Sequence, residues 1–485
     1  MKKTKELTLG LLLALVAAFS LAIFACDDGD SNGDDDDTGK TDDDDNDSGK
    51  TDDDDDDNDD NDSGKTDDDD DSDPPPPKGE TLDVNADIKS DTTWKAGNTY
   101  ILKKHIFVDG ATLTIEKGVT VKGEMGTSLV VATNGKINAV GTKDYPIVFT
   151  SSKPEGDRHA GDWGGVVLLG KAKLNITGGT EKVEGFPATE TRTVYGGSDD
   201  THDCGTIKYA RIEFAGFELA PDNELNGLTL GGCGSKTTLE YIQIHMGADD
   251  GIEFFGGTAN VKYLVVSEPD DDGIDWDFGY SGKIQFAIVH QNAVVGDKGM
   301  ECDSNKNNND AEPRSNPQLW NITLAGSNSA PGTAGKEQSG IHFRRGTAGK
   351  VNNMVMAYFA DYGVNISDNS TVQQFKDGNL AIKNSIFWSI GGKNDALPVE
   401  AKDDDEGFEE EKEIMNAGHN NKFADPKFND PHNYDSPNFT PAADSPVFEG
   451  GATPPNDGFF DASATFIGAI GKDDWTKGWT AYPAN

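Results

Sequence analysis

A two-strand unit recurs along most of the chain and limits its fold more than any other feature. The first strand is a six-residue, mostly apolar run that begins at Ile207, Leu239, Val261, Ile284, Leu319, Val351 and Ile382. The second is a glycine followed by two apolar residues that flank a variable one, beginning at Gly227, Gly251, Gly273, Gly299, Gly340 and Gly363. Where the loops are short, the period is 22 to 23 residues. That period is too short for a propeller blade or a paired-helix repeat, and it predicts the coils of a parallel β-solenoid.

The third residue of each first strand indicates how the coils stack. These residues are Tyr209, Tyr241, Tyr263 and Phe286, followed by Asn321, Asn353 and Asn384. Equivalent residues of adjacent coils lie one strand spacing apart, about 4.8 Å. We therefore expect an aromatic stack that continues into an asparagine ladder.

With these repeats the chain resembles the right-handed parallel β-helix superfamily, which has the pectin-lyase-like fold. Four further motifs resemble a narrower group of bacterial surface lipoproteins of uncharacterised function. They are Trp163-Gly-Gly-Val-Val-Leu-Leu-Gly, Asn223-Glu-Leu-Asn-Gly-Leu-Thr-Leu, Met246-Gly-Ala-Asp-Asp-Gly and Asp474-Trp-Thr-Lys-Gly-Trp-Thr. The resemblance covers roughly residues 85–485. It implies an all-β, right-handed parallel β-helix over residues 79–395 and a closing segment over 396–485 that packs over the last open rung.

The N-terminus reads as an export signal. A basic start is followed by an apolar run from Leu7 to Ala25 and then by Cys26, which is the layout of a secretory signal over residues 1–25. The sequence Ile23-Phe24-Ala25-Cys26 resembles a bacterial lipobox, which implies cleavage before Cys26 and acylation of its thiol, for example with palmitate. The alternative is a plain signal peptide with an incidental cysteine.

Residues 26–78 predict a disordered acidic and proline-containing tether. Residues 27–73 hold 27 Asp and three Lys, so they carry 24 of the 45 net negative charges. With no apolar residue to bury, such a segment stays extended and solvated. A calcium-binding array is the alternative, but the glycine and glutamate spacing of calcium loops is absent. The acidic residues after Cys26 resemble surface-export signals, whereas Asp27 alone resembles an inner-membrane retention signal. The outer membrane or cell surface is thus favoured, and the periplasmic face stays open.

Charge and cysteines restrict the partners and the compartment. A net charge of −45 argues against a nucleic-acid partner. Cys204 and Cys233 each lie a few residues before consecutive first strands, so they fall in neighbouring turns, and we predict a disulfide between them. Cys302 is expected to be a buried thiol.

Outward columns of the second strand contain the candidate site. Because side chains alternate along a strand, the residues between the inward apolar ones face outward. The first outward column reads Thr229, Glu253, Asp275, Glu301, His342 and Asn365, and the next reads Gly231, Phe255, Asp277, Asp303, Arg344 and Ser367. The preceding loops add Asp249, Asp250, Asp271, Asp272 and Asp297. Inward Phe254, Trp276 and Phe343 are expected in the core.

Stacked carboxylates destabilise a sheet unless their charge is compensated. Calcium suits such a ribbon because it accepts several oxygen ligands in loose geometry. The expected ligands are Asp249, Asp250, Glu253, Asp271, Asp272, Asp275, Asp277 and Glu301. A solvated acidic face that keeps the protein soluble is the alternative, and a catalytic site is a further one.

The preferred interpretation is a non-catalytic surface module that binds a glycan or another envelope component, possibly with calcium, through Phe255, Asp277, Asp303 and Arg344. The first alternative is a polysaccharide lyase or glycoside hydrolase that acts on acidic polysaccharide, with Glu253, Asp275, Glu301, His342 and Arg344 as candidate catalytic residues. Against it, the Gly-His-Gly and Arg-Ile-Lys signatures of polygalacturonases are absent. A structural surface spacer is the second alternative. No phosphate loop or haem motif appears, so no organic cofactor is expected.

Overall fold

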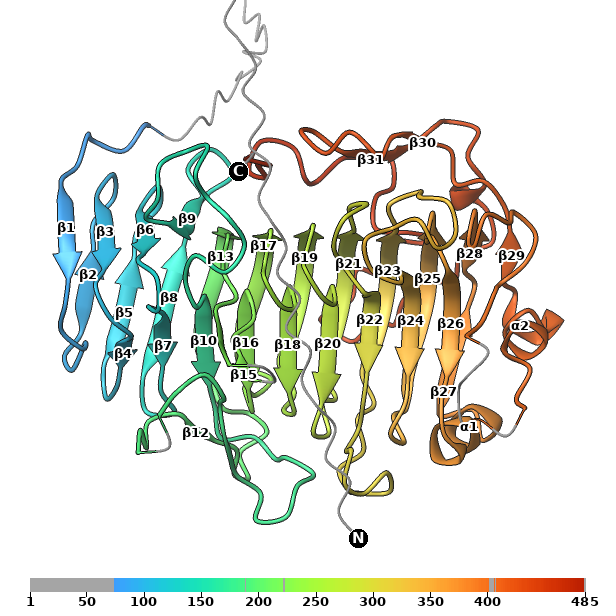
Figure 1. Ribbon diagram of the computed structural model, residues 1–485, viewed down its shortest axis with the longest axis horizontal. Helices are drawn as coiled ribbons and strands as arrows, with labels where there is room; N and C mark the ends of the chain where they lie inside the picture. The colour runs from blue at the N-terminus through green and yellow to red at the C-terminus, as the bar shows by residue number, and fades with distance from the viewer. Residues whose placement is uncertain (1–73, 188, 221–222, 401–404, 406, 484–485) are drawn as a thin grey trace, which may run out of the picture. The chain divides into compact units, whose positions relative to one another are not determined.

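The structure of the protein, a computed structural model, describes residues 74–187, 189–220, 223–400, 405 and 407–483 (Figure 1). The expected signal peptide, the lipidated Cys26 and the acidic tether up to residue 73 lie outside the described residues. No helix within the described part has the length and apolar content needed to cross a membrane.

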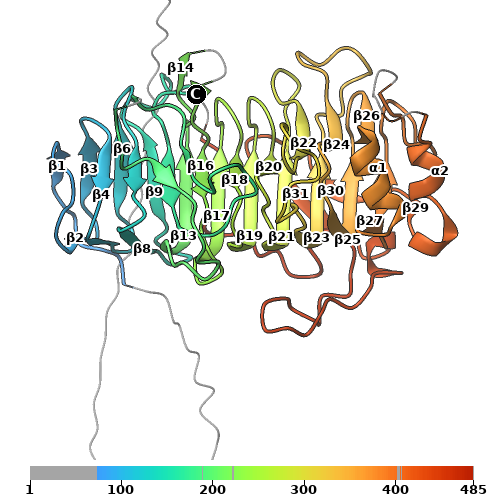
Figure 2. The ribbon, with the colours of Figure 1, turned by 90° about the horizontal axis from the view of Figure 1, so that it is seen from below.

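The described chain forms a parallel β-helix, as the sequence predicts. Strands of successive coils pair in parallel, and the coils follow one another along one axis from blue to orange in Figures 1 and 2. The larger sheet contains β1 (Thr81–Val84), β2 (Thr92–Trp94), β3 (Thr99–Leu102), β5 (Thr112–Ile115), β6 (Thr120–Gly123), β8 (Lys136–Val140), β9 (Ile147–Ser151), β13 (Gly205–Glu213), β17 (Thr238–His245), β19 (Asn260–Ser267), β21 (Lys283–His290), β23 (Gln318–Ala325), β25 (Gly349–Ala357), β27 (Leu380–Lys383), β28 (Ile386–Trp388) and β29 (Lys422–Phe423). The smaller sheet contains β4 (Ile106–Val108), β7 (Leu129–Val131), β10 (Val166–Leu169), β16 (Leu228–Gly231), β18 (Ile252–Phe255), β20 (Ile274–Asp277), β22 (Lys298–Cys302), β24 (Ser339–Phe343) and β26 (Tyr362–Ile366).

Shorter elements lie outside the coils. They are the strand pairs β11 (Glu181–Lys182) with β12 (Val194–Tyr195), β14 (Glu218–Ala220) with β15 (Asn223–Glu224) and β30 (Phe428–Asp430) with β31 (Asn438–Pro441), the helices α1 (Asn369–Lys376) and α2 (Glu410–Ile414), and short 3-10 helices at Ala417–His419 and Pro446–Phe448. Phe375 of α1 and Ile414 of α2 join the main apolar core. Both helices lie at the orange end of the solenoid (Figure 2).

Each long first strand bends at its third repeat residue, which the sequence did not predict. In β13 the residues before Tyr209 pair with β8 and those after it pair with β9, so the strand contributes to two faces of the coil. The bend residues all have positive φ: Tyr209, Tyr241, Tyr263, Phe286, Asn321, Asn353 and Asn384. Left-handed backbone is costly for side chains other than glycine, and asparagine tolerates it best. The column of asparagines therefore fits the bend directly.

The aromatic members of this column stack as predicted. Ring centroids are 4.3 Å apart between Tyr209 and Tyr241, 4.2 Å between Tyr241 and Tyr263, and 4.9 Å between Tyr263 and Phe286. This stacking offsets part of the cost of the strained backbone.

The asparagines differ from the expected ladder. Asn321 donates to the carbonyls of Ala464 and Phe466. Asn353 Nδ2 donates to the Ala452 carbonyl, and Ala452 N donates to Asn353 Oδ1. Gln285 of β21 also donates to Asn321 Oδ1 at 3.1 Å. The side chains of Asn321 and Asn353 therefore bond to the C-terminal segment and to Gln285 rather than to each other, because that segment runs alongside the column and offers backbone groups within reach.

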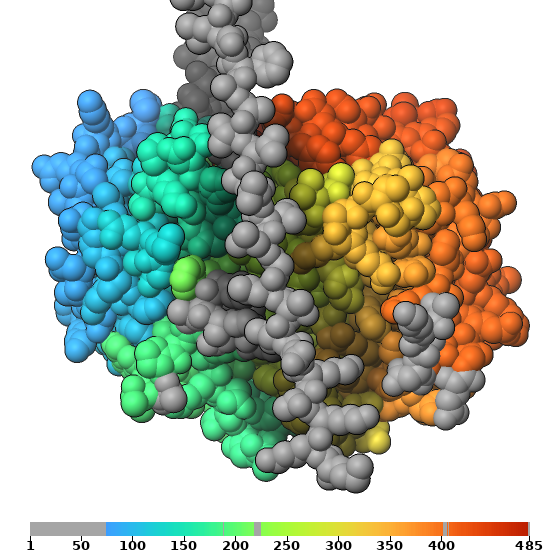
Figure 3. Space-filling model, viewed as in Figure 1, coloured from blue at the N-terminus to red at the C-terminus, as the bar shows by residue number. Residues whose placement is uncertain are grey.

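The C-terminal segment, residues 420–483, extends back along the side of the solenoid. It begins at the last rung, where β29 pairs with β28, and returns until Trp479 packs its ring edge on Tyr241. In Figure 3 its red surface lies along the upper side of the coils. Outward apolar residues such as Ile288 and Val355 explain this path, because the segment buries them under Phe439 and Val447.

Candidate functional site

The outward carboxylates occupy equivalent positions on adjacent strands of the smaller sheet. Glu253 of β18 is in register with Asp275 of β20, which is in register with Glu301 of β22. His342 of β24 continues the same row. The next residue in each strand points the other way and is fully buried inside the coil: Phe254, Trp276, Cys302 and Phe343. Strand alternation thus places a line of carboxylates on the outer face.

A cavity of about 650 Å³ lies over this face. Its floor is made by the carboxylates of Glu253, Asp275, Asp277, Glu301 and Asp303. Its volume lies within the range of small-molecule and cofactor sites. The carboxylate face is therefore hollowed rather than flat.

Two insertions form the walls of the cavity, one from residues 175–184 and one from residues 305–311. The two meet where Asn175 donates to the Ser304 carbonyl at 3.0 Å and Asn305 donates to the Asn175 carbonyl at 2.9 Å. Neither insertion follows the coil period, so the repeat does not predict that they join.

Tyr195 of β12 closes the side of the cavity nearest the N-terminal coils. A Cβ built on Gly231 would lie 2.7 Å from the Tyr195 ring, so the glycine allows the ring to sit directly on β16. The Tyr195 and Phe255 rings are also neighbours, with centroids 6.0 Å apart. Aromatic surface therefore borders the carboxylates on this side.

Three cations compensate the carboxylates at the β22 end. Lys298 Nζ lies 3.1 Å from Glu301, and Arg344 also contacts Glu301. Arg344 Nε lies 2.7 Å from Asp303, which Arg345 contacts as well. The predicted ligand contacts Asp303 and Arg344 are therefore paired with each other.

The carboxylates of β18 and β20 form no such ion pair with a described lysine or arginine, although Arg345 and Lys306 act on Asp277 electrostatically. One oxygen of Asp275 and one of Asp277 are buried without a hydrogen-bond partner among the described residues. Glu253 accepts a hydrogen bond from Asn226 at 2.6 Å, which supplies no charge. Buried polar atoms normally have partners, so these oxygens require an explanation.

Burial and mutual repulsion raise the pKa of these carboxyls. The pKa values of Asp250, Glu253, Asp275 and Asp277 all lie well above their usual range, with desolvation as the largest cause and neighbouring carboxylates adding to it. Burial raises the pKa of Asp272 to about 7, although Lys298 lies nearby. Proton or cation binding at this face is thereby favoured.

The carboxylates in the turns before the strands accept hydrogen bonds from the backbone of the next rung. Asp272 N donates to Asp250 Oδ1 at 3.0 Å, and Lys298 N donates to Asp272 Oδ1 at 2.7 Å. Each side chain therefore fixes the turn of the next rung. The residue after each is a glycine, Gly251 or Gly273, where a Cβ would lie 2.3 Å from a valine methyl group.

Carboxylate oxygens converge closely enough to share a cation in four groups. Within each group the oxygens lie within 4.8 Å of one another: Asp249, Asp250 and Asp271; Asp250, Glu253 and Asp275; Asp271, Asp272 and Asp297; Asp272, Asp275 and Glu301. The last two groups include residues already paired with Lys298 or, for Asp271, with Lys336. Asp277 belongs to none of the four. Asp250, Glu253 and Asp275 form the group with the least positive charge nearby.

His342 and the disulfide complete the list of sequence candidates. The His342 ring lies 2.6 Å from the Ser367 hydroxyl on the next rung, away from the carboxylate group of β18 and β20. Cys204 and Cys233 are joined by a disulfide, and the Cys302 thiol is buried. Cys204 follows Tyr195 by nine residues in the sequence.

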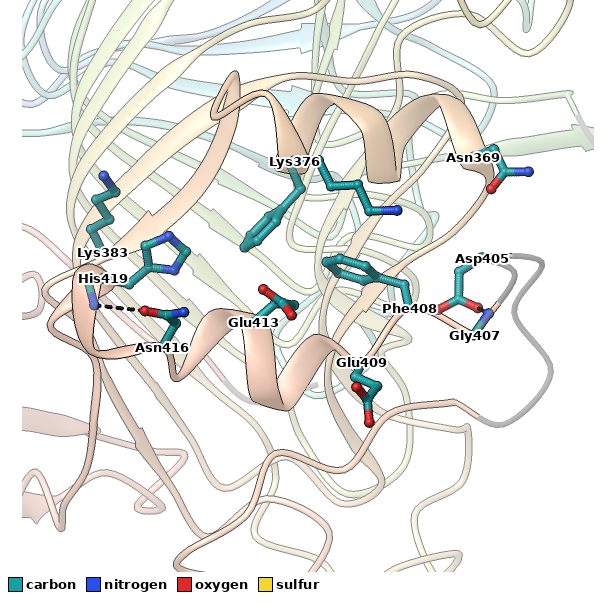
Figure 4. Close-up of a pocket in the computed structure, with 12 residues that line it drawn as sticks. Asn369, Lys376, Lys383, Asp405, Gly407, Phe408, Glu409, Glu413, Asn416 and His419 are labelled. Carbon is teal, nitrogen blue, oxygen red and sulfur yellow. Dashed lines mark hydrogen bonds between the residues drawn. The ribbon is translucent and has the colours of Figure 1, made fainter.

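A second cavity, of about 730 Å³, lies at the far end of the solenoid between α1 and α2 (Figure 4). Phe375 and Phe408 pack edge to face in it, with Lys376 over the Phe408 ring. Its charged groups have both signs and include Lys376 and Glu413. The described residues that line it include no group of converging carboxylates like that of the first cavity.

Comparison with protein families agrees with this architecture. Residues 86–480 match the model of the pectate-lyase like β-helix domain. The chain belongs to this family. No curated protein and no solved structure matches it. For this pectate-lyase like β-helix protein, family membership therefore explains the coils, and the chemistry of the cavity rests on the residues described above.

Proposed function

We propose that this protein is a non-catalytic β-helix module that binds a glycan or another envelope component in the cavity over β18, β20 and β22, with calcium as a bridging ion. The observation that carries this proposal is the pair of buried, unpartnered oxygens on Asp275 and Asp277. An anionic floor in which the carboxylates of β18 and β20 form no ion pair with a described residue attracts a cation, and an ion held there attracts an acidic ligand.

Asp250, Glu253 and Asp275 are the calcium ligands in this proposal. Their oxygens converge within 4.8 Å, and no described lysine or arginine forms an ion pair with them. Calcium prefers carboxylate oxygens at 2.3–2.6 Å and tolerates irregular geometry. Asp277 then faces the ligand beside the ion, together with Phe255 on the cavity wall.

The positive groups of the cavity support binding of an acidic ligand. Arg345 and Lys306 line the same cavity as the carboxylates, and more than a third of the Arg345 side chain is exposed. A ligand carboxylate between the ion and Arg345 would satisfy both. Neutral parts of a sugar can contact the rings of Phe255 and Phe278, which also line the cavity.

Polysaccharide cleavage is the second candidate. It is favoured by the raised pKa of Glu253 next to other carboxyls, an arrangement that suits acid–base chemistry. Against it, both arginines near the floor are held in ion pairs with Glu301 or Asp303. Release of new reducing ends from an acidic polysaccharide distinguishes cleavage from binding.

Attachment to a bacterial envelope is part of the same proposal. The export signal, the lipobox-like sequence before Cys26 and the acidic tether support a lipid-anchored module held away from the membrane, at the cell surface or on the periplasmic face. Mass spectrometry of the mature N-terminus tests this part separately, because acylation adds a defined mass to Cys26.

Calorimetric titration of the full chain with calcium tests the ion site. We expect saturable binding that the double variant Glu253→Gln/Asp275→Asn loses. The matched control Asp271→Asn/Asp297→Asn removes another group of converging carboxylates and should keep the site. The acidic tract is common to all three proteins, so its contribution cancels. Equal binding by all three would overturn the assignment.

Affinity electrophoresis tests the ligand. Gels that contain polygalacturonate should retard the wild-type protein in calcium but not in EGTA, and gels that contain neutral dextran should not. The Glu253→Gln/Asp275→Asn variant should migrate alike in all gels. Retardation by dextran would contradict charge-based recognition.

A further inference from the structure

Asp277 of β20 differs from the other carboxylates on the floor of the cavity. It belongs to none of the four groups of converging oxygens, so it is not a ligand of the proposed calcium ion. Its Oδ1 atom is nevertheless buried without a hydrogen-bond partner among the described residues. Buried polar atoms normally have partners, and the calcium ion does not supply one here. Asp277 therefore requires a partner of its own.

Two phenylalanine rings lie beside this carboxylate. Phe255 of β18 is in register with Asp277, one strand spacing of about 4.8 Å away, and Phe278 is the next residue of the chain. Both rings are half-buried, line the cavity and have centroids 6.0 Å apart. Beyond Phe255, Tyr195 lies over Gly231 of β16, with its ring centroid 6.0 Å from that of Phe255. A carboxylate bordered by aromatic rings suits an ammonium group, because both attract a cation.

A purely acidic ligand does not suit this part of the floor. Burial and neighbouring carboxylates, among them Asp303 and Glu184, raise the pKa of Asp277, and a further anion beside it would add to the repulsion. The pKa stays raised although Arg345 and Lys306 act on Asp277 in the opposite direction. A positive group on the ligand offsets the cost that remains.

We infer that the glycan bound in this cavity contains an amino sugar with a free amino group, and that Asp277, Phe255 and Phe278 bind that unit. The inference rests on the proposed glycan-binding function and specifies the class of ligand. The sugar ring packs on the two phenylalanine rings, and its ammonium group pairs with the Asp277 carboxylate. Acidic groups elsewhere on the same glycan contact the calcium ion and Arg345, so the ligand carries charges of both signs.

Calorimetric titration of the full chain with two oligosaccharides tests the inference. The glucosamine tetramer carries ammonium groups at pH 6.5, whereas the N-acetylglucosamine tetramer has the same sugar backbone without the charge. NaCl at about 0.3 M weakens attraction of the positive probe to the acidic tract of residues 27–73. In calcium and in EGTA, we expect the glucosamine tetramer to bind at least about tenfold more tightly, since its ammonium group forms a charge-assisted hydrogen bond.

Three variants locate the binding. Asp277→Asn keeps the shape of the side chain and should weaken binding of the glucosamine tetramer by about tenfold or more. Phe255→Leu keeps an apolar side chain without the ring and should weaken binding by about threefold. The matched control is Glu181→Gln, which removes the charge of an exposed carboxylate on the cavity wall. It should bind within about twofold of the wild type, because exposed charges contribute little at this salt concentration.

No binding of the glucosamine tetramer, equal affinity for the two oligosaccharides, or equal affinity of the wild type and Asp277→Asn would each overturn the inference. Binding of calcium and polygalacturonate without preference for the glucosamine tetramer would overturn the inference alone and leave the proposed function standing. Preference for the glucosamine tetramer without any binding of calcium would instead retain the amino-sugar site and overturn the proposed ion.

Discussion

Replacing Asp275 with asparagine should stabilise the metal-free protein and abolish its response to calcium. Asp275 lies between Glu253 and Glu301 on adjacent strands, and one of its oxygens has no partner among the described residues. Asparagine keeps the shape of the side chain and removes the charge. Its amide can also donate to a neighbouring carboxylate, which the aspartate cannot do when ionised.

Two routes give the size of the effect. Unit charges about 4.8 Å apart repel by roughly 3.5 kcal/mol at an effective dielectric constant near 20. If the carboxyl is instead protonated at pH 7, the cost is about 4 kcal/mol, because an unfolded aspartate has a pKa near 3.9. Solvent in the cavity screens part of either cost. We therefore expect Asp275→Asn to raise the free energy of unfolding in EGTA by about 1–3 kcal/mol.

Denaturant unfolding at pH 7, followed by tryptophan fluorescence, measures the change. In calcium at a hundred times its Kd, the wild type should gain about 2.7 kcal/mol and the variant much less. Asp473→Asn, at an exposed aspartate, is the control and should change stability by less than about 0.5 kcal/mol in either buffer. A variant less stable than the wild type in EGTA would refute the reasoning, because the Asp275 charge would then already be compensated.

Three further predictions concern the cavity and the fold around it. In EGTA the stability should fall as pH rises from about 4 toward 7, because carboxyls with raised folded pKa values, such as Asp272 at about 7, bind more protons in the folded state; calcium should remove this fall, and a stability that rises with pH in EGTA would contradict it. Replacing Cys204 and Cys233 with serine should lower the free energy of unfolding by about 3–4 kcal/mol, from the loop entropy of a 29-residue separation, as measured by urea unfolding against the oxidised wild type. Tyr241→Ala should cost about 3–5 kcal/mol, because the ring stacks on two others and supports Trp479; Tyr241→Phe, which keeps the ring, should cost much less by the same assay.

Much of the fold was readable from the sequence because a solenoid repeats its local rules. The glycine before each second strand sets the register, and alternation then places Glu253, Asp275 and Glu301 on one outer face. The bend in the first strands was missed because tyrosine does not favour positive φ. The asparagines that occupy the same column at Asn321 and Asn353 were the available signal.

The rest of the site depends on contacts that have no period. Lys298 precedes the glycine of β22, as Asp272 precedes the glycine one rung earlier. Its pairing with Glu301 therefore becomes visible once the turns are superposed. The cavity walls come from insertions joined through Asn175 and Asn305, far apart in sequence. No spacing rule predicts such a junction, since neither insertion repeats.

A crystal structure of the protein grown in calcium tests the central claim most directly. The account predicts an ion bound by Asp250, Glu253 and Asp275 at oxygen distances of about 2.3–2.6 Å. An ion bound instead between Asp271 and Asp297, or a carboxylate floor without any ion at saturating calcium, would contradict it.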